Sequence, residues 1–173
     1  AGGTNRKATA ARLATYINAA AGALTHKEGG TNFTNSLLVG TSSTGTLNAA
    51  DGNTGVGVGV FGALTTGDNN VAVGLNALDL NTTGASNTAV GFGALCKNTT
   101  AANNTGVGTS ALSSVTTGAN NTAVGFGAGS QTTTGAGVVS VGYQANRFNT
   151  TGTGNVAIGL EALQGVSGNT HNR

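Results

Sequence analysis

The sequence predicts an all-β protein: a parallel β-solenoid, or β-roll, of eight 17-residue turns preceded by a short N-terminal helix. A Val-Gly or Ile-Gly dipeptide returns every 17 residues between residues 39 and 159. A Thr-Thr-Gly marker recurs between these dipeptides with the same spacing. The chain also contains 31 Gly, no Pro and only 7% charged residues. A short fixed period indicates a solenoid, and glycine-dense corners suit a coil of short strands better than a layered globular core.

The segment before the repeats has helical spacing. Its apolar residues follow a 3-4-3-4 pattern, the seam pattern of a coiled coil, at Ala10, Leu13, Ile17, Ala20 and Leu24. The expected helix covers residues 7–21. Two interpretations stay open, a short oligomerising helix and a helix that simply packs on the coil or caps it.

These patterns divide the chain into three segments. We expect residues 1–32 to form a helical entry or oligomerisation segment, residues 33–168 the solenoid repeats, and residues 169–173 a tail. Whole blocks superpose within the repeats: NVAVGLNAL at 70–78, NTAVGFGAL at 87–95, NTGVGTSAL at 104–112 and NVAIGLEAL at 155–163.

Each repeat contains a short strand. In one repeat Thr88 and Val90 alternate with Ala89, and this period of two predicts a strand. We expect Thr88 and Val90 to point into the coil and to form its core with Phe92 and Leu95. Turns stacked at the strand spacing of a sheet rise by about 4.8 Å. So slim a coil buries too little apolar area to offset backbone ordering at about 1–2 kcal/mol per residue, so further burial between chains is expected.

Two residue types recur at structural positions of the repeat. Glycine is expected where a corner needs a positive φ or where another backbone comes close; the corner glycines are Gly40, Gly57, Gly74, Gly91, Gly108, Gly125, Gly142 and Gly159. Asparagine stands four residues earlier in six turns, and its amide is expected to bond to the equivalent residues above and below. These ladder asparagines are Asn53, Asn70, Asn87, Asn104, Asn121 and Asn155.

Groups for catalysis or metal binding are few. The chain has five carboxylates and two histidines, His26 and His171, which lie outside the repeats. We therefore expect no enzyme, no catalytic residues and no cofactor. Asp51 and Asp68 are 17 residues apart and should lie about 5 Å apart in successive corners. That separation suits a weak cation site or a retaining glycosidase pair, whereas solvated turn aspartates are the simpler interpretation.

Stacked threonines suggest a rival function. A row at Thr83, Thr100, Thr117, Thr134 and Thr151 resembles the ordered surface of ice-binding solenoids. Those surfaces usually carry Thr-x-Thr on one strand, whereas Thr82 and Thr83 are adjacent here and point opposite ways.

Asn-x-Thr glycosylation acceptors are also numerous. They occur at Asn32, Asn81, Asn98, Asn103, Asn120 and Asn149. A chain rich in Asn and Thr generates this motif automatically.

Charge and hydropathy argue against two classes of partner. The net charge is +2, but four of the seven basic residues precede the repeats. Because no basic stripe follows the coil, we expect no nucleic-acid partner. No apolar run is long enough to span a bilayer, so no membrane insertion is expected. Cys96 is the single cysteine, which excludes an intrachain disulfide.

The repeat block resembles a known family. NTAVGFGAL at residues 87–95 resembles the head repeats of trimeric autotransporter adhesins, which implies a trimeric, left-handed parallel β-roll. The segment GGTNFTNSLLVG at 29–40, after RKATAARLATYI at 6–17, looks like the segments that lead into such repeats in bacteriophage tail fibres. The adhesin repeats are usually shorter than the repeat found here.

The expected function is that of a non-catalytic structural fibre segment, a homotrimer that could also stack end to end into filaments. The resemblance implies a bacteriophage tail or capsid fibre, located in the virion, that attaches to a glycan or protein on the host surface. The alternatives are a bacterial trimeric surface adhesin or extracellular filament subunit, and an ice-binding solenoid. Val138, Val139, Arg147 and Phe148 break the pattern of neighbouring turns and are the candidate residues for specific contact.

Overall fold

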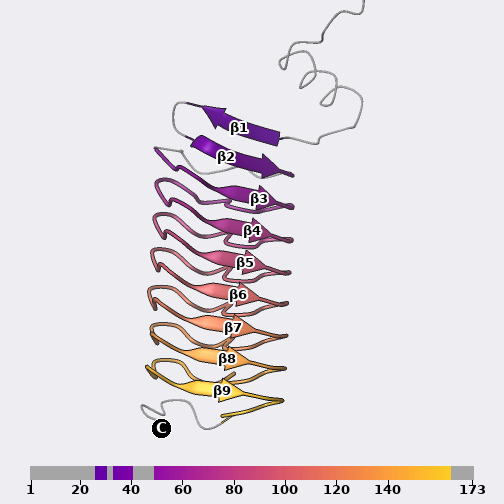
Figure 1. Cartoon of the computed structure of the whole chain (residues 1–173), viewed down its shortest axis with the longest axis vertical. Coiled ribbons are helices and arrows are strands. Elements are labelled where there is room, and N and C mark those ends of the chain that lie inside the picture. The colour runs from indigo at the N-terminus through magenta and orange to yellow at the C-terminus, as the bar shows by residue number, and fades with distance from the viewer. Residues whose placement is uncertain (1–25, 31–32, 41–48, 165–173) are drawn as a thin grey trace, which may run out of the picture.

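The protein is a coil of short strands stacked along one long axis (Figure 1). The computed structural model describes residues 26–30, 33–40 and 49–164. The coil begins with two longer strands, β1 (His26–Gly30) and β2 (Phe33–Val39). Seven strands of three residues follow, namely β3 (Thr54–Val56), β4 (Val71–Val73), β5 (Thr88–Val90), β6 (Thr105–Val107), β7 (Thr122–Val124), β8 (Val139–Val141) and β9 (Val156–Ile158).

All of these strands belong to one sheet, in the order of the sequence. β1 pairs antiparallel with β2, and each later strand pairs parallel with the one before it. The register advances by one repeat per strand, so that Val73 lies beside Val56 on one side and Val90 on the other. The predicted parallel β-solenoid is therefore confirmed, with about seven turns in place of eight.

The strand of the first predicted turn differs from the others. It is β2, which has seven residues and pairs with β1 so that His26 lies opposite Val39. Among the described residues the sheet therefore starts at His26, inside the segment 1–32 for which the sequence predicts a helical entry. The β1 sequence HKEGG has neither alternation nor β-branched residues, so no local pattern predicts it. Its pairing covers what would otherwise be an open edge of β2.

The N-terminal helix expected over residues 7–21 lies outside the described residues, as does the predicted tail at residues 169–173. Within the part of the chain that the structure describes there is no helix.

The side chains of each short strand face the opposite way from the one that the sequence predicts. The middle residue of each short strand is buried, and the two flanking residues face outward. Ala89 is fully buried, whereas Thr88 and Val90 are only half-buried and Phe92 is 52% exposed. Of the four residues predicted to form the core of this turn, Leu95 alone lies there. The expectation that Thr88 and Val90 point inward was wrong.

The narrow interior explains this phase. Large side chains from the side opposite the strands fill the core, among them Phe61, Leu78, Leu95 and Leu112. A Cβ atom on Gly55, in the middle of β3, would lie only 2.9 Å from the Val60 side chain and 3.1 Å from the Phe61 ring. Only glycine, alanine or serine therefore occupies the middle of a short strand, and the larger Val and Thr residues take the outward positions.

The corner glycines allow successive turns to approach closely. Their φ angles lie between 123° and 141°, where residues with a side chain are strained. A Cβ atom on Gly91 would also lie 2.6 Å from the carbonyl carbon and oxygen of Gly108 in the next turn. A positive φ and a close backbone approach therefore both require glycine at this corner.

The substitution Gly91→Ala is expected to destabilise the coil by about 3 kcal/mol or more, because it combines backbone strain with overlap against the next turn. Gly93→Asn is a matched control. Gly93 has a φ of 62°, its Cβ would meet nothing within 4 Å, and the equivalent residue of the previous turn is Asn76 with a φ of 57°. The control should cost less than about 1 kcal/mol. Urea unfolding measures both variants, and equal losses of stability would contradict the role assigned to the corner.

Candidate functional site

A ladder of buried asparagines runs through the coil. The Oδ1 atom of Asn70 accepts hydrogen bonds from the N–H of Asn87 at 2.9 Å and from its Nδ2 at 3.1 Å. The Nδ2 of Asn87 also donates to the carbonyl oxygen of Ala101 at 2.8 Å. The N–H to Oδ1 bond joins successive ladder asparagines from Asn53 onward and ends on the N–H of Val138. The ladder side chains thus satisfy backbone groups inside the coil.

A second row of buried asparagines was missed by the sequence analysis, which treats Asn81, Asn98 and Asn149 only as glycosylation acceptors. The Nδ2 atoms of Asn81 and Asn98 donate to carbonyl oxygens three residues further on, at 2.9 and 3.0 Å, and Asn149 makes the same bond. All three residues are buried, whereas the glycosylation acceptors Asn103 and Asn120 are exposed. Asn81, Asn98 and Asn149 are separated by whole repeats of 17 residues, and this spacing is the signal that could have identified the row.

Asp51 and Asp68 bond to the backbone of their turns. The Oδ1 of Asp68 accepts a hydrogen bond from the N–H of Asp51 at 2.8 Å, and the Oδ1 of Asp51 accepts one from the N–H of Gly52 at 2.8 Å. These bonds are ordinary for aspartates in turns. Among the described residues, no group of three His, Cys, Asp or Glu side chains could hold a metal ion.

Two side chains in the middle of the coil have shifted pKa values. Burial raises the pKa of the Cys96 thiol, and desolvation raises the pKa of the Asp79 carboxyl group. The Sγ atom of Cys96 lies 3.4 Å from the carbonyl oxygen of Ser113, to which it donates. A thiol with a raised pKa stays protonated at neutral pH and is a poor nucleophile.

The outward residues of the short strands form an apolar surface, which we call the strand face. It consists of Thr54, Val56, Val71, Val73, Thr88, Val90, Thr105, Val107, Thr122, Val124, Val139, Val141, Val156 and Ile158. Val73 is 36% exposed and Ile158 is 69% exposed. The strand face contains no charged residue. A contiguous exposed apolar surface of this kind marks an interaction site.

A further row of large side chains, the corner row, follows the corner glycines. Its members are Val58, Leu75, Phe92, Thr109, Phe126, Tyr143 and Leu160. The rings of Phe126 and Tyr143 stack with their centroids 5.4 Å apart and their planes at 11°. About half of each of these two side chains is exposed.

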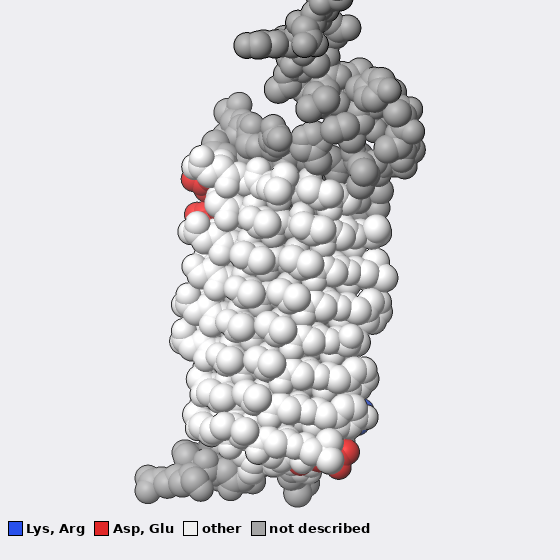
Figure 2. Space-filling model, turned by 45° about the vertical axis from the view of Figure 1, so that its right-hand side comes forward, with Lys and Arg blue, Asp and Glu red and all other residues white. Residues whose placement is uncertain are grey.

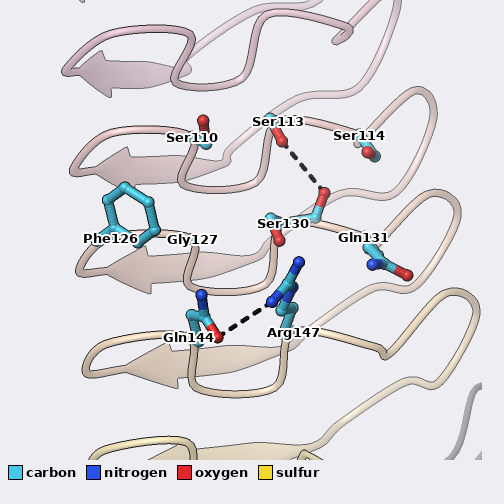
Figure 3. A pocket seen from close by; sticks show the side chains of 9 residues that line it. All are labelled: Ser110, Ser113, Ser114, Phe126, Gly127, Ser130, Gln131, Gln144 and Arg147. Carbon is cyan, nitrogen blue, oxygen red and sulfur yellow. Dashed lines mark hydrogen bonds between the residues drawn. The ribbon is translucent and has the colours of Figure 1, made fainter.

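A shallow polar depression, which we call the serine pocket, lies beside this aromatic pair. Figure 3 shows its side chains on three successive turns, with the strands behind them. The pocket has a volume of about 290 Å³ and is lined by Ser110, Ser113, Ser114, Phe126, Gly127, Ser130, Gln131, Gln144 and Arg147. The Nη1 of Arg147 donates to the Oε1 of Gln144 at 3.1 Å. Hydroxyl, amide and guanidinium groups therefore converge on one hollow.

The four residues that break the repeat pattern lie in different places. Arg147 lines the serine pocket, and its guanidinium carbon lies 5.1 Å from the centroid of the Phe148 ring. Val138 is fully buried, and Val139 belongs to the strand face. The structure therefore brings Arg147 and Phe148 together and separates them from the two valines.

The two rows of adjacent threonines differ in exposure. Thr83 and Thr100 are exposed. Their neighbours Thr82 and Thr99 are half-buried, and each Oγ1 donates to a carbonyl oxygen of the next turn, at 2.9 and 3.1 Å. One hydroxyl of each pair is therefore used inside the coil.

The outer surface carries little charge. Figure 2 shows a face of the coil that is almost free of charged side chains, with acidic groups near its two ends. The described part of the chain consists of strands and turns, and it contains no helix that is long and apolar enough to cross a membrane.

The substitution Asn87→Leu is expected to destabilise the coil by about 1–3 kcal/mol, the cost of one unsatisfied buried group. It leaves the buried N–H of Asn104 without its side-chain partner, whereas the carbonyl oxygen of Ala101 keeps its hydrogen bond from Asn98. Asn103→Ser is the control, because Asn103 is exposed and Ser86 occupies the same place in the previous turn with a similar φ. It should change stability by less than about 0.5 kcal/mol. Thermal unfolding compares the two, and a loss below about 1 kcal/mol for Asn87→Leu would contradict the ladder's role.

Comparison of the chain with protein-family models, with curated proteins and with solved structures finds no match. Its function is therefore argued from the surfaces of the coil.

Proposed function

We propose that the chain is a non-catalytic structural segment of a fibre, and that copies of it associate through their strand faces into a homotrimer. The single observation that carries this proposal is the apolar strand face, which extends over β3 to β9. No cofactor is part of the proposal, and neither nucleic acid nor a membrane is a proposed partner.

The exposed area of the strand face supplies the driving force. Fully burying a Val or Ile side chain contributes about 1.5–3 kcal/mol. Val73 and Ile158 are 36% and 69% exposed, whereas the members on β5, β6 and β8 are half-buried. Association of copies would bury this area in every turn, and it would supply the apolar burial that the narrow core of a single coil lacks.

Another copy of the chain is the partner that fits this face best. The exposed rows repeat at the strand spacing of about 4.8 Å along the whole coil. A partner must rise by the same distance per turn to keep contact at both ends, and a second copy has that rise. Closed cyclic assemblies are the usual result of such self-association. The resemblance of the block at residues 87–95 to adhesin head repeats supports three copies and a left-handed coil.

The proposed role follows from this shape. A stiff rod with several identical chains holds binding sites away from a particle or cell, and it raises the avidity of weak contacts through their effective concentration. The segment at residues 29–40 resembles the lead segments of bacteriophage tail fibres. This supports a tail or capsid fibre of a virion that attaches to a host glycan or protein. A bacterial surface adhesin or extracellular filament is the alternative, and it requires the same trimer.

End-to-end stacking is a further part of the proposal. Within the described residues β9 pairs with β8 alone, so its outer edge offers free backbone groups to another strand. Ice binding is less well supported, because Thr82 and its equivalents donate their hydroxyls to the backbone and leave a single exposed threonine row.

Light scattering tests the association. The wild-type chain should have three times its 16.5 kDa mass, or a multiple of that trimer mass where trimers stack end to end. Val124→Lys should shift the mass to that of one chain, because it places three positive charges in the apolar interface. Thr117→Lys adds the same charge to the exposed threonine row and should leave the trimer intact. A wild-type mass of one chain, or equal dissociation of the two variants, would contradict the proposal.

A further inference from the structure

We propose that the serine pocket binds a single sugar ring that carries a carboxylate group. This inference rests on the proposed role of the fibre in attachment to a host surface, and it names the class of ligand and the residues that recognise it. Nine residues of three turns line the pocket, and none of them is acidic.

The residues of the pocket are not required by the coil. Ser113, Ser130 and Arg147 are equivalent in successive turns, and the preceding turns have Asp79 and Cys96 in the same place. The structural rows change far less, since the corner glycine is present in every turn. Side chains that the scaffold leaves free to vary gather here into one hollow. In repeat proteins, the variable side chains on one face commonly form the binding surface.

The pocket offers unused hydrogen-bonding groups. The Oγ of Ser113 donates to the carbonyl oxygen of Ser130 at 3.2 Å. Within the described part of the chain, the side chains of Ser110, Ser114 and Gln131 make no hydrogen bond. Hydroxyl and amide groups both donate and accept, which matches the alternating donors and acceptors of a ring with several hydroxyls.

Arg147 is held in position by neutral partners. Its Nη1 donates to Gln144, whose Nε2 in turn donates to the hydroxyl of Tyr143 at 3.3 Å. The Phe148 ring lies under the guanidinium group. Neither Gln144 nor Phe148 neutralises the positive charge, and a guanidinium group matches a carboxylate with two parallel hydrogen bonds. The arginine therefore selects an acidic ligand over a neutral one.

The rim and the size of the pocket fit one ring. Phe126 lines the pocket and stacks on Tyr143, so an apolar ring face finds an aromatic surface beside the polar groups. The volume of about 290 Å³ is just below the range for small-ligand sites, about 300–1,000 Å³. The hollow therefore suits one compact ring.

The pocket remains open in the proposed trimer. None of the nine pocket residues belongs to the strand face, and in Figure 3 the strands lie behind the pocket side chains. Burial of the strand face would leave one pocket on each chain. Three weak sites on one rod would then act together on a surface that carries many copies of the sugar.

Saturation-transfer NMR on the full chain tests the inference with pairs of sugars that differ in one group. Glucuronate is compared with glucose, and galacturonate with galactose, with N-acetylneuraminate as a third acid. We expect transfer to at least one acid and weaker transfer to the neutral sugar of each pair. Arg147→Gln should weaken binding of that acid by about tenfold or more, because one charged hydrogen-bonding group is lost.

Lys97→Gln is the matched control. It removes one positive charge from an exposed residue outside the pocket, so binding should stay unchanged. Equal weakening by the two variants, or no transfer to any of the three acids, would overturn the inference. Light scattering on the same samples separates the two proposals: a wild-type trimer that binds no acid refutes the pocket alone, whereas a single-chain mass refutes the fibre whether or not an acid binds.

Discussion

The structure depends on the close contact between the backbones of adjacent turns. The parallel strands bring each turn within hydrogen-bonding distance of the next, and the N–H of Gly91, for example, donates to the carbonyl of Val73 at 2.8 Å. At the corners this contact leaves no room for a side chain, so glycine recurs there. Where the backbone turns away from the sheet, the ladder asparagines complete the bonding between turns. The residues that recur every 17 positions are therefore those that this contact requires in each turn.

The same contact divides the residues between the inside and the outside of the coil. The interior is too narrow for two layers of large side chains, so the strands contribute small residues such as Ala89 and the opposite side contributes Leu95. The branched residues of the strands must then face outward. A coil built in this way bonds the backbones of successive turns to one another but leaves branched apolar side chains exposed, and this explains the apolar strand face.

The fold could be predicted from the sequence because the period records the stacking of turns directly. Two features of the fold could not be predicted. The alternation of Thr88, Ala89 and Val90 shows two faces but does not say which one is inside; that depends on the width of the core, which is set by residues such as Leu95 on the other side. β1 carries no pattern of its own, because its place in the sheet comes from backbone pairing with β2.

The candidate site was only partly predictable for a similar reason. Arg147 stands out from its sequence because it interrupts a repeat. The serines and glutamines around it do not stand out singly, and only the stacking of three turns brings Ser110, Ser130 and Gln144 together. The buried row of Asn81 and Asn98 could not be predicted for the same reason. An Asn-x-Thr motif indicates a surface site unless the asparagine side chain is known to point inward, as it does here.

The antiparallel pair of β1 and β2 gives the coil a starting point for folding. Gly30 pairs with Phe33 only three residues later, whereas Val73 pairs with Val90 one full repeat later. Short loops cost less conformational entropy to close than long ones, and local contacts form faster. Once formed, the pair presents the free edge of β2 to the next strand, and each added strand presents an equivalent edge to the one after it. We therefore expect the strands to add to the sheet one after another in a fixed direction, from β2 toward β9.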